Sequence, residues 1–227
     1  MSRTAIITAI QRCLKRGPLP ADQQAMLTSR LATHPRGPIP ARGQLDLPGR
    51  IALFTQYAER EFATVAQLTS PAEIPTAIAA YLARLHLPPT LTISPHPALE
   101  AIPFAAAPSL QVRFGTTLPA DSTCLTHAFA GIAETGTLLM PSGPRTPTTN
   151  NILPDNSIIL LPAARITASY EDAFDLLRAE QTFPRQTLPR NVMLITGPSR
   201  SADIEQTLEL GAHGPRRLHI LILDGQG

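Results

Sequence analysis

The sequence has 227 residues and a formal net charge of +2 at pH 7; 43% of its residues are hydrophobic and 16% are charged. This composition gives enough apolar surface for one large folded domain, or for one domain with an N-terminal extension. A nucleic-acid-binding protein is not expected, because the arginines are scattered and there is no tryptophan on which bases could stack.

The first part of the chain is predicted to be mostly helical. Apolar residues at helical spacing predict helices over residues 1–16, 21–31 and 51–68. Residues 34–48 are dense in Pro, Gly and Arg, which indicates a loop or a disordered tether. Ser70, followed by Pro71 and Glu73, is a helix start signal, and that helix is expected to end at Pro88.

The remainder alternates between strand-like and helix-like segments. Strands are predicted over residues 90–94, 110–114, 123–125, 137–140, 157–161, 192–196 and 218–223. Helices are predicted over residues 170–179 and 202–210, the second closed by Gly211. This alternation predicts an α/β fold, with a mainly parallel sheet covered on both faces.

The most informative segment runs from an apolar strand, residues 192–196, into a small polar turn and the predicted helix. The carboxyl end of a parallel strand is where ligands bind, and a helix start offers free N–H groups to an anion. Arg200 could clamp a carboxylate or a phosphate. The structural alternative is a serine N-cap and a first-turn aspartate. The ligand-binding candidates here are Gly197, Ser199, Arg200, Ser201 and Asp203.

A second segment places Glu134 between apolar stretches, directly before a turn made by Thr135, Gly136 and Thr137. A carboxylate beside a tight glycine turn can act as a general base, a nucleophile or a hydroxyl-binding group. We therefore take Glu134 as a catalytic candidate and the three turn residues as ligand-binding candidates. The alternative is a structural glutamate that accepts backbone N–H bonds.

Two histidines and one loop complete the candidates. His213, after the predicted helix C-terminus, is a second catalytic candidate, although a capping histidine in a connecting loop is the commoner case. His127 could enter the same pocket as Glu134. No metal site is expected, because no second ligand stands at metal-binding spacing beside His213. The Pro-rich residues 141–147 could form a lid over the site or an ordinary surface loop.

The cysteines and the N-terminus indicate a soluble cytoplasmic protein. Cys13 and Cys124 form no CxxC pair, so neither a disulfide framework nor a four-thiolate iron–sulfur cluster is expected on this chain. Charges interrupt the apolar run of residues 1–15, unlike a signal peptide, and no stretch is long enough to span a bilayer.

Taken in order, four blocks make the chain resemble the lactate utilisation protein C family (LutC/YkgG type), which consists of a single LUD domain. These blocks are residues 132–137, 153–155, 196–205 and 211–216, and they cover the C-terminal half. The resemblance implies one LUD-type domain over residues 1–227, with a mostly helical part (1–88) and an α/β core (89–227). The sequence departs from the family over residues 141–151, where only Arg145 remains of an expected basic stretch.

The resemblance also implies a fold and a function. The fold would be a three-layer α/β/α sheet similar to the sugar-phosphate isomerase and CoA-transferase group. The function would be L-lactate oxidation to pyruvate within a three-protein system whose cysteine-rich and iron–sulfur partners hold the redox centres, so that this chain binds no cofactor itself.

Three hypotheses stay open. The chain could be a non-redox subunit of that system that binds a small carboxylate, a phosphate or a partner surface. It could instead be a stand-alone metabolite enzyme of the isomerase or transferase type that uses Glu134. It could also be a purely structural assembly subunit.

Overall fold

The computed structural model describes residues 2–15, 17–180, 189–202 and 208–225, and the chain divides into two compact units, Met1–Pro38 and Ile39–Gly227. The first unit contains helices α1 (Arg3–Cys13) and α2 (Ala21–Thr33), both of which the sequence predicts. The second unit contains all the candidate site residues. The prediction of one domain over residues 1–227 stays a prediction.

The second unit is built on a six-stranded sheet in which every pair of neighbouring strands is parallel. Across the sheet the strands are β1 (Thr64–Leu68), β12 (Arg217–Leu223), β7 (Asn156–Pro162), β4 (Thr123–His127), β2 (Thr90–Ile93) and β3 (Gln111–Phe114). β7 and β12 each contain a continuous run of apolar residues and are buried along most of their length, as expected for strands covered on both faces.

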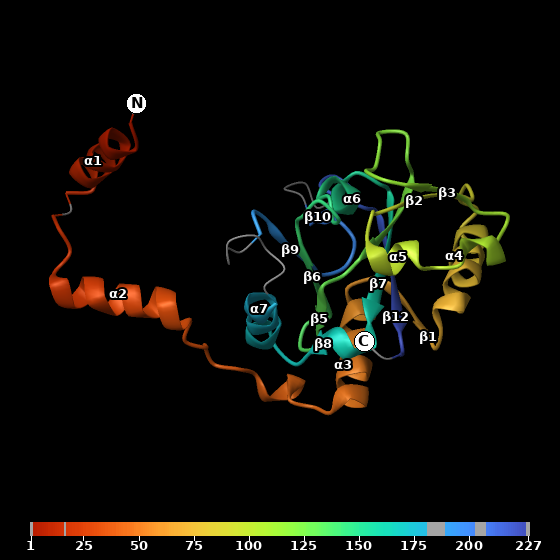
Figure 1. The fold of residues 1–227 in the computed structure, drawn as a ribbon, viewed down its shortest axis with the longest axis horizontal. Coiled ribbons are helices and arrows are strands. Elements are labelled where there is room, and N and C mark those ends of the chain that lie inside the picture. Colours follow the sequence, from red (N-terminus) through yellow and green to blue (C-terminus); the bar gives the residue numbers. More distant parts are fainter. Residues whose placement is uncertain (1, 16, 181–188, 203–207, 226–227) are drawn as a thin grey trace. The chain divides into compact units, whose positions relative to one another are not determined.

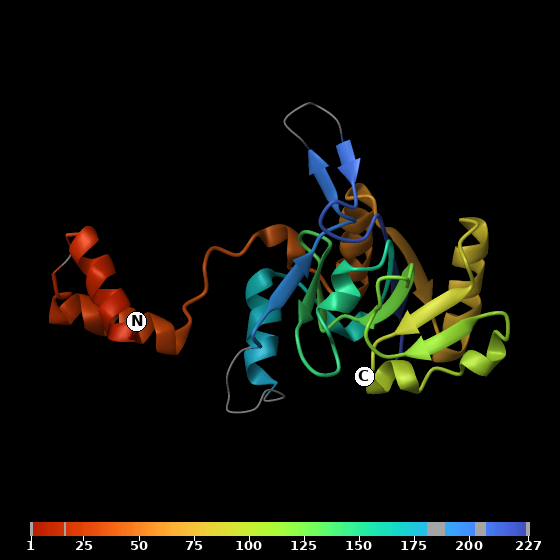
Figure 2. The same ribbon diagram turned by 90° about the horizontal axis from the view of Figure 1, so that it is seen from above.

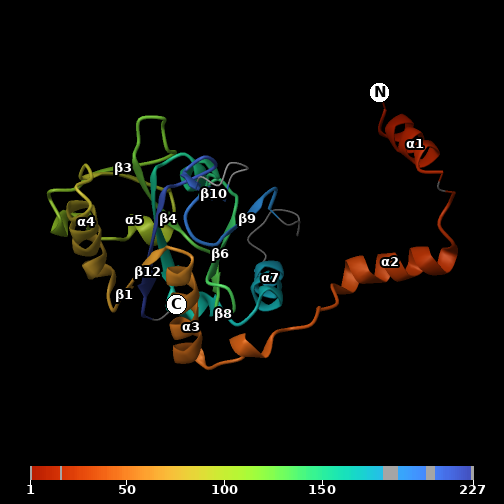
Figure 3. The ribbon, with the colours of Figure 1, turned by 180° about the vertical axis from the view of Figure 1, so that it is seen from behind.

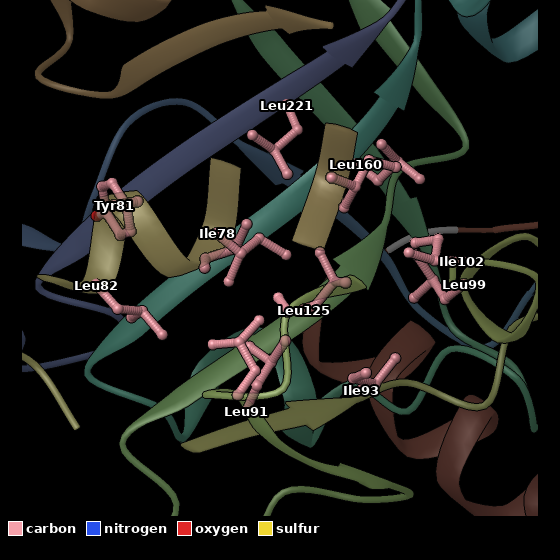
Figure 4. Close-up of a cluster of buried hydrophobic side chains, with 14 of the residues drawn as sticks. Ile78, Tyr81, Leu82, Leu91, Ile93, Leu99, Ile102, Leu125, Leu160 and Leu221 are labelled. Carbon is pink, nitrogen blue, oxygen red and sulfur yellow. The ribbon is translucent and has the colours of Figure 1, made fainter. Parts of the chain in front are cut away.

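Helices cover both faces of this sheet, which confirms the predicted α/β fold. On one face α4 (Ile74–Arg84) and α5 (Pro97–Glu100) pack over a buried cluster that includes Ile78, Leu125 and Leu160 (Figure 4). On the other face Phe54 and Ala58 of α3 (Leu47–Arg60) pack against a second buried cluster. Figures 1 and 3, viewed from opposite sides, show α3 and α5 on the two faces.

A smaller four-stranded sheet lies on the α3 side and carries two of the candidate segments. Its order is β8 (Ile166–Thr167), β5 (Ala130–Ile132), β6 (Thr137–Pro141) and β9 (Val192–Ile195), with β6 antiparallel to both of its neighbours. Helix α7 (Tyr170–Ala179) packs on this sheet through a third apolar cluster. The short elements are α6 (Thr149–Ile152), η1 (Ala41–Gly43), η2 (Pro71–Glu73), η3 (Phe104–Ala106) and η4 (Ala163–Arg165).

One predicted helix ends earlier than expected, and another is wrong. The helix expected over residues 51–68 ends at Arg60, because Phe62 adopts a left-handed φ of +68° and turns the chain into strand β1. The helix expected over residues 202–210 is absent at both described ends. β10 (Arg200–Ala202) instead pairs antiparallel with β11 (Leu208–Leu210), and the two strands lie side by side in Figure 2.

The pairing of β10 with β11 is stabilised at the end of the hairpin where the two strands join the rest of the domain. The Gly211 N–H donates to the Ser199 carbonyl oxygen at 3.0 Å, and Gly211 adopts a left-handed φ of +85°. Cross-strand contacts of this kind override the local helical preference that the sequence suggested. Among the described residues, no helix is long and apolar enough to cross a membrane.

Candidate functional site

Glu134 is a buried carboxylate whose two oxygens differ in their hydrogen bonding. It follows strand β5, and its side chain is only 3% exposed. Its Oε1 accepts the backbone N–H of Tyr170, the first residue of α7, at 3.2 Å. Its Oε2 has no hydrogen-bond partner among the described residues. The first bond supports the structural interpretation, whereas a buried, unpaired carboxylate oxygen requires a further explanation.

The turn after Glu134 is shaped by contact with helix α3. Gly136 adopts a left-handed φ of +66°, and a Cβ there would lie 2.4 Å from the backbone nitrogen of Ala58. Only glycine fits this position, because any side chain would be strained by its φ and would clash with α3. Segment 39–46 approaches the other side of the turn, since a Cβ on Gly43 would lie 3.3 Å from the Cβ of Glu134.

Four hydroxyl groups join the two candidate turns. Thr137 Oγ1 lies 2.7 Å from Thr196 Oγ1, 2.8 Å from Thr135 Oγ1 and 3.0 Å from the Tyr170 hydroxyl. Thr135 Oγ1 also donates to the Tyr170 hydroxyl at 3.2 Å. Thr137 is fully buried, whereas Thr196, which follows β9, is exposed. The two turns, about sixty residues apart in the chain, are therefore in direct contact.

Gly197 and Ser199 fix the second turn rather than leave its backbone free. A Cβ on Gly197, whose φ is +77°, would lie 2.2 Å from the carbonyl oxygen of Glu61 at the end of α3. The Ser199 N–H donates to the Pro215 carbonyl oxygen at 2.8 Å, and Ser199 Oγ accepts the His213 N–H at 3.2 Å. Ser199 therefore holds the loop 211–216 against the turn.

The other residues of this turn that were predicted to bind a ligand lie in a different structural environment from the one that the sequence predicts. Strand β9 pairs with antiparallel β6, so the turn does not stand at the carboxyl end of the parallel sheet, and it opens the β10–β11 hairpin rather than a helix. Ser201 lies in β10 and pairs with Glu209. Asp203 lies outside the described residues. No helix N-terminus follows this turn in its described part, so the predicted dipole contribution to anion binding is wrong.

Arg200 is already engaged by neighbouring groups. Its Nη2 donates to Glu61 Oε2 at 2.9 Å, and its guanidinium carbon lies 4.1 Å from the centre of the Phe62 ring. Through this ion pair and this cation–π contact, the guanidinium already uses much of its capacity for hydrogen bonds and electrostatic contacts. A role for Arg200 in ligand binding would require it to exchange these partners, and it stays a prediction.

His213 follows strand β11, not a helix, and its side chain is exposed. Its backbone N–H, rather than its ring, donates to the serine hydroxyl described above. Three of the four blocks of the resemblance therefore converge through backbone and hydroxyl contacts, while the catalytic roles suggested for Glu134 and His213 stay predictions. Among the described residues, no three His, Cys, Asp or Glu side chains come together as a metal site would require.

The sequence prediction missed a pair of stacked histidines on the main sheet. His127 ends β4 and His96 follows β2, and their rings lie 4.1 Å apart and within 10° of parallel. Burial lowers the pKa of His127 to about 3, with smaller contributions from His96 and Arg165. His127 was expected near Glu134, yet its ring packs on His96. The available signal was the position of each histidine at the end of a strand.

Comparison with known proteins gives matches over part of the chain. Residues 118–223 match the LUD domain family model, which confirms the resemblance found in the sequence. An uncharacterized protein of Neisseria meningitidis is 38% identical over 42% of this chain and 40% of its own length. Lactate utilization protein C 1 of Bacillus mycoides is 32% identical over 56% of this chain and 48% of its own length.

Two further matches agree. Lactate utilization protein C of Bacillus subtilis is 34% identical over 44% of this chain and 42% of its own length, so the match spans less than half of each of these relatives. A DUF162 family protein from Deinococcus radiodurans shares the fold with a TM-score of 0.59 and 22% identity, covering 80% of this chain and 99% of that one.

Proposed function

We propose that this LUD-domain protein works in lactate utilisation, as a non-redox subunit of a system that oxidises L-lactate to pyruvate. The observation that carries the proposal is the LUD match over residues 118–223 together with relatives named lactate utilization protein C at 32–34% identity. The match spans less than half of each relative, so the activity is proposed for this chain rather than transferred from them. We also propose the cytoplasmic location that the sequence predicts.

The redox step is assigned to partner proteins. Oxidation of lactate to pyruvate releases two electrons and two protons, and an acceptor must take the electrons. Cys13 is exposed, and burial raises the pKa of Cys124 to about 12, so its thiol is unsuited to act as a thiolate. We therefore propose that cysteine-rich and iron–sulfur partner proteins take up the electrons, while this chain binds the acid or a partner surface.

Glu134 is the residue to test for a chemical role within this subunit. Its Oε2 is buried and has no hydrogen-bond partner in the described part of the chain, so that oxygen can accept a hydrogen bond from a ligand group that reaches it. The stand-alone isomerase or transferase hypothesis would use the same oxygen. The bond from Tyr170 to Oε1 would orient the carboxylate in either case.

The experiment is reconstitution of lactate-dependent dye reduction from the cysteine-rich protein, the iron–sulfur protein and this chain. We expect dye reduction to fall to background when this chain is omitted and to return when it is added back. Glu134→Gln should fail to restore it, while Glu59→Gln, at an exposed position on α3, should restore it fully. Dye reduction that proceeds equally well without this chain would refute the proposed function.

A further inference from the structure

Strand β1 forms one edge of the six-stranded sheet, and its sequence does not protect that edge. Among the described strands β1 pairs only with β12, and it contains neither a proline nor a charged residue. The strand at the opposite edge, β3, carries Arg113, which pairs with Asp121. Charges and prolines are common on edge strands, because free N–H and C=O groups can otherwise pair with another chain. β1 therefore lacks a device that β3 has.

The backbone of β1 presents hydrogen-bonding groups at this edge. The Leu68 carbonyl oxygen accepts the Asp224 N–H at 2.7 Å, so the backbone groups of Leu68 face the β12 side. Backbone groups alternate in direction along a strand, so those of Val65 and Gln67 face away from β12. Val65 is half-buried and Gln67 is exposed. Two residues of β1 can thus pair with a further strand.

A cavity of about 640 Å³ lies beside β1. Its lining combines one end of the strand with small or long side chains of one helix: Thr64, Val65 and Ala66 of β1, and Ala77, Ala80 and Arg84 of α4. The alanine side chains leave the space between helix and strand unfilled. The cavity is therefore continuous with the edge at which β1 lacks a neighbouring strand.

The polar groups in this cavity do not favour a small polar ligand. The Tyr81 ring, which Figure 4 shows over β12, stacks on the His219 ring at 4.1 Å. His219 Nδ1 lies 2.8 Å from Thr64 Oγ1, so these two groups already bond to each other. The rest of the lining named above is apolar or backbone, apart from Arg84. An extended chain suits such a surface better than a polar metabolite does.

The cavity-facing side of α4 is self-complementary in charge. Glu73, Ala77, Ala80 and Arg84 follow one another at intervals of four, three and four residues, which places them on one helix face. The acid is at the start of this face and the base is at its end. Glu73 accepts hydrogen bonds from Thr69. Arg84 forms no ion pair with a carboxylate in the described part of the chain, and its guanidinium lies 5.8 Å from the Tyr81 ring centre.

We propose that β1 pairs antiparallel with β1 of a second copy of this chain, about a twofold axis at Ala66. Val65 of each copy would then exchange backbone hydrogen bonds with Gln67 of the other, and the sheet would continue through the dimer. The same axis runs the two α4 helices in opposite directions. It brings Arg84 of each copy toward Glu73 of the other, with the alanines between them. This charge match selects a second copy over an unrelated strand.

The first test is the mass and the amide exchange of the full-length chain. We expect sedimentation at micromolar concentration to give twice the 24.4 kDa of one chain. In hydrogen exchange followed by NMR, the Val65 and Gln67 amides should exchange slowly, because the second copy supplies their acceptors. A monomer, or a dimer in which both amides exchange freely, would overturn the proposal.

A proline at the edge tests the backbone pairing. Gln67→Pro removes an N–H that faces away from β12, so the sheet within one copy keeps its hydrogen bonds. It removes one cross-strand bond from each copy and should raise the dimer dissociation constant about thirtyfold. Gln67→Thr keeps the N–H at the same position, and this matched control should dimerise as the wild type does. A Gln67→Pro protein that is folded by circular dichroism and as dimeric as this control would refute the strand pairing.

Charge reversal tests the antiparallel arrangement. Arg84→Glu should weaken the dimer about tenfold, because it places a second acid beside Glu73 of the other copy. Glu73→Arg should act similarly, and the double variant Glu73→Arg/Arg84→Glu should restore much of the affinity. A double variant no tighter than either single variant would show that these side chains do not meet. The dimer does not rest on the role in lactate utilisation, so either proposal can fail while the other stands.

Discussion

The two regions that hold the candidate residues differ in how their polar groups are used. In the Glu134–Thr137 and Thr196–Ser199 turns, most of the described polar side chains bond to each other or to backbone, and both glycines press against helix α3. At His96 and His127 the rings stack on each other at the open end of the main sheet. The first region has sequence motifs, whereas the second has none that a pattern search would notice.

This difference separates two reasons for a distinctive sequence motif. A turn that needs left-handed glycines and interlocking hydroxyls has a specific sequence because few residues fit it. A ring pair formed across two strands needs only one residue at the right position on each strand. We therefore expect changes in the turns to act on stability through packing and backbone strain, and changes at the histidine pair to act on how stability depends on pH.

The largest expected effect is loss of stability in acid. Burial lowers the pKa of His127 to about 3 and of His219 to about 4, so both are neutral in the folded state while an unfolded histidine titrates near 6.5. The stability from each is complete above pH 6.5 and is lost as pH falls toward its folded pKa. From pH 6.5 to 5 the two should remove up to about 4 kcal/mol, since each contributes at most about 1.4 kcal/mol per pH unit.

Urea unfolding at pH 7, 6 and 5 measures this loss, and the double variant His127→Asn/His219→Asn isolates the histidine part. The variant should be less stable at pH 7, because ring stacking on His96 and Tyr81 is lost, yet its stability should change less with pH. Equal pH slopes in wild type and variant would show that neither ring is kept neutral by the fold.

The next effect concerns the turns. Gly197→Ala should lower the free energy of unfolding by about 3 kcal/mol, because the new Cβ meets the Glu61 carbonyl oxygen at 2.2 Å and φ is +77°. Gly143→Ala is the matched control, since its Cβ would meet nothing closer than 3.5 Å. Chemical unfolding of both variants measures the difference, and a Gly197→Ala protein as stable as the control would contradict the close packing on α3.

Glu134 tests whether its region also has a chemical role. Glu134→Ala should cost about 2 kcal/mol, because the Tyr170 N–H loses its acceptor and a buried space opens. Glu134→Gln keeps an oxygen acceptor and should cost less than about 1 kcal/mol. Thermal unfolding measures both variants. If the glutamine variant unfolds as readily as the alanine variant, the carboxylate charge itself is needed for the fold.

The sequence predicted those features that local patterns determine. The parallel sheet followed from alternating strands and helices, and α7 was predicted with its bounds because Ser169 and the apolar spacing define it locally. These successes share one cause: neighbouring residues, rather than distant partners, set the structure.

The failures depended on distant partners. The β10–β11 hairpin replaces a predicted helix because Gly211 bonds to Ser199 and the strand backbones pair, which no helical spacing reveals. β9 looked like a central parallel strand, but it pairs with β6 in the smaller sheet. His96 escaped notice because it lies thirty-one residues before His127, and only the strand order brings the two rings together.

The smallest effect sharpens the interpretation of Arg200. Its ion pair with Glu61 is partly exposed, with side-chain exposures of 23% and 38%, and such pairs contribute little because solvent and salt weaken them. Its contact with Phe62 adds a similar amount. Arg200→Ala should therefore cost about 1 kcal/mol, and Arg200→Lys should recover part of that through its charge.

Urea unfolding at low and high salt separates the two contributions, because only the ion pair should weaken as salt rises. If Arg200→Ala leaves the free energy of unfolding unchanged at both salt concentrations, the contacts with Glu61 and Phe62 do not stabilise the fold. Arg200 could then leave these partners without cost, as the ligand-binding role predicted from the sequence requires.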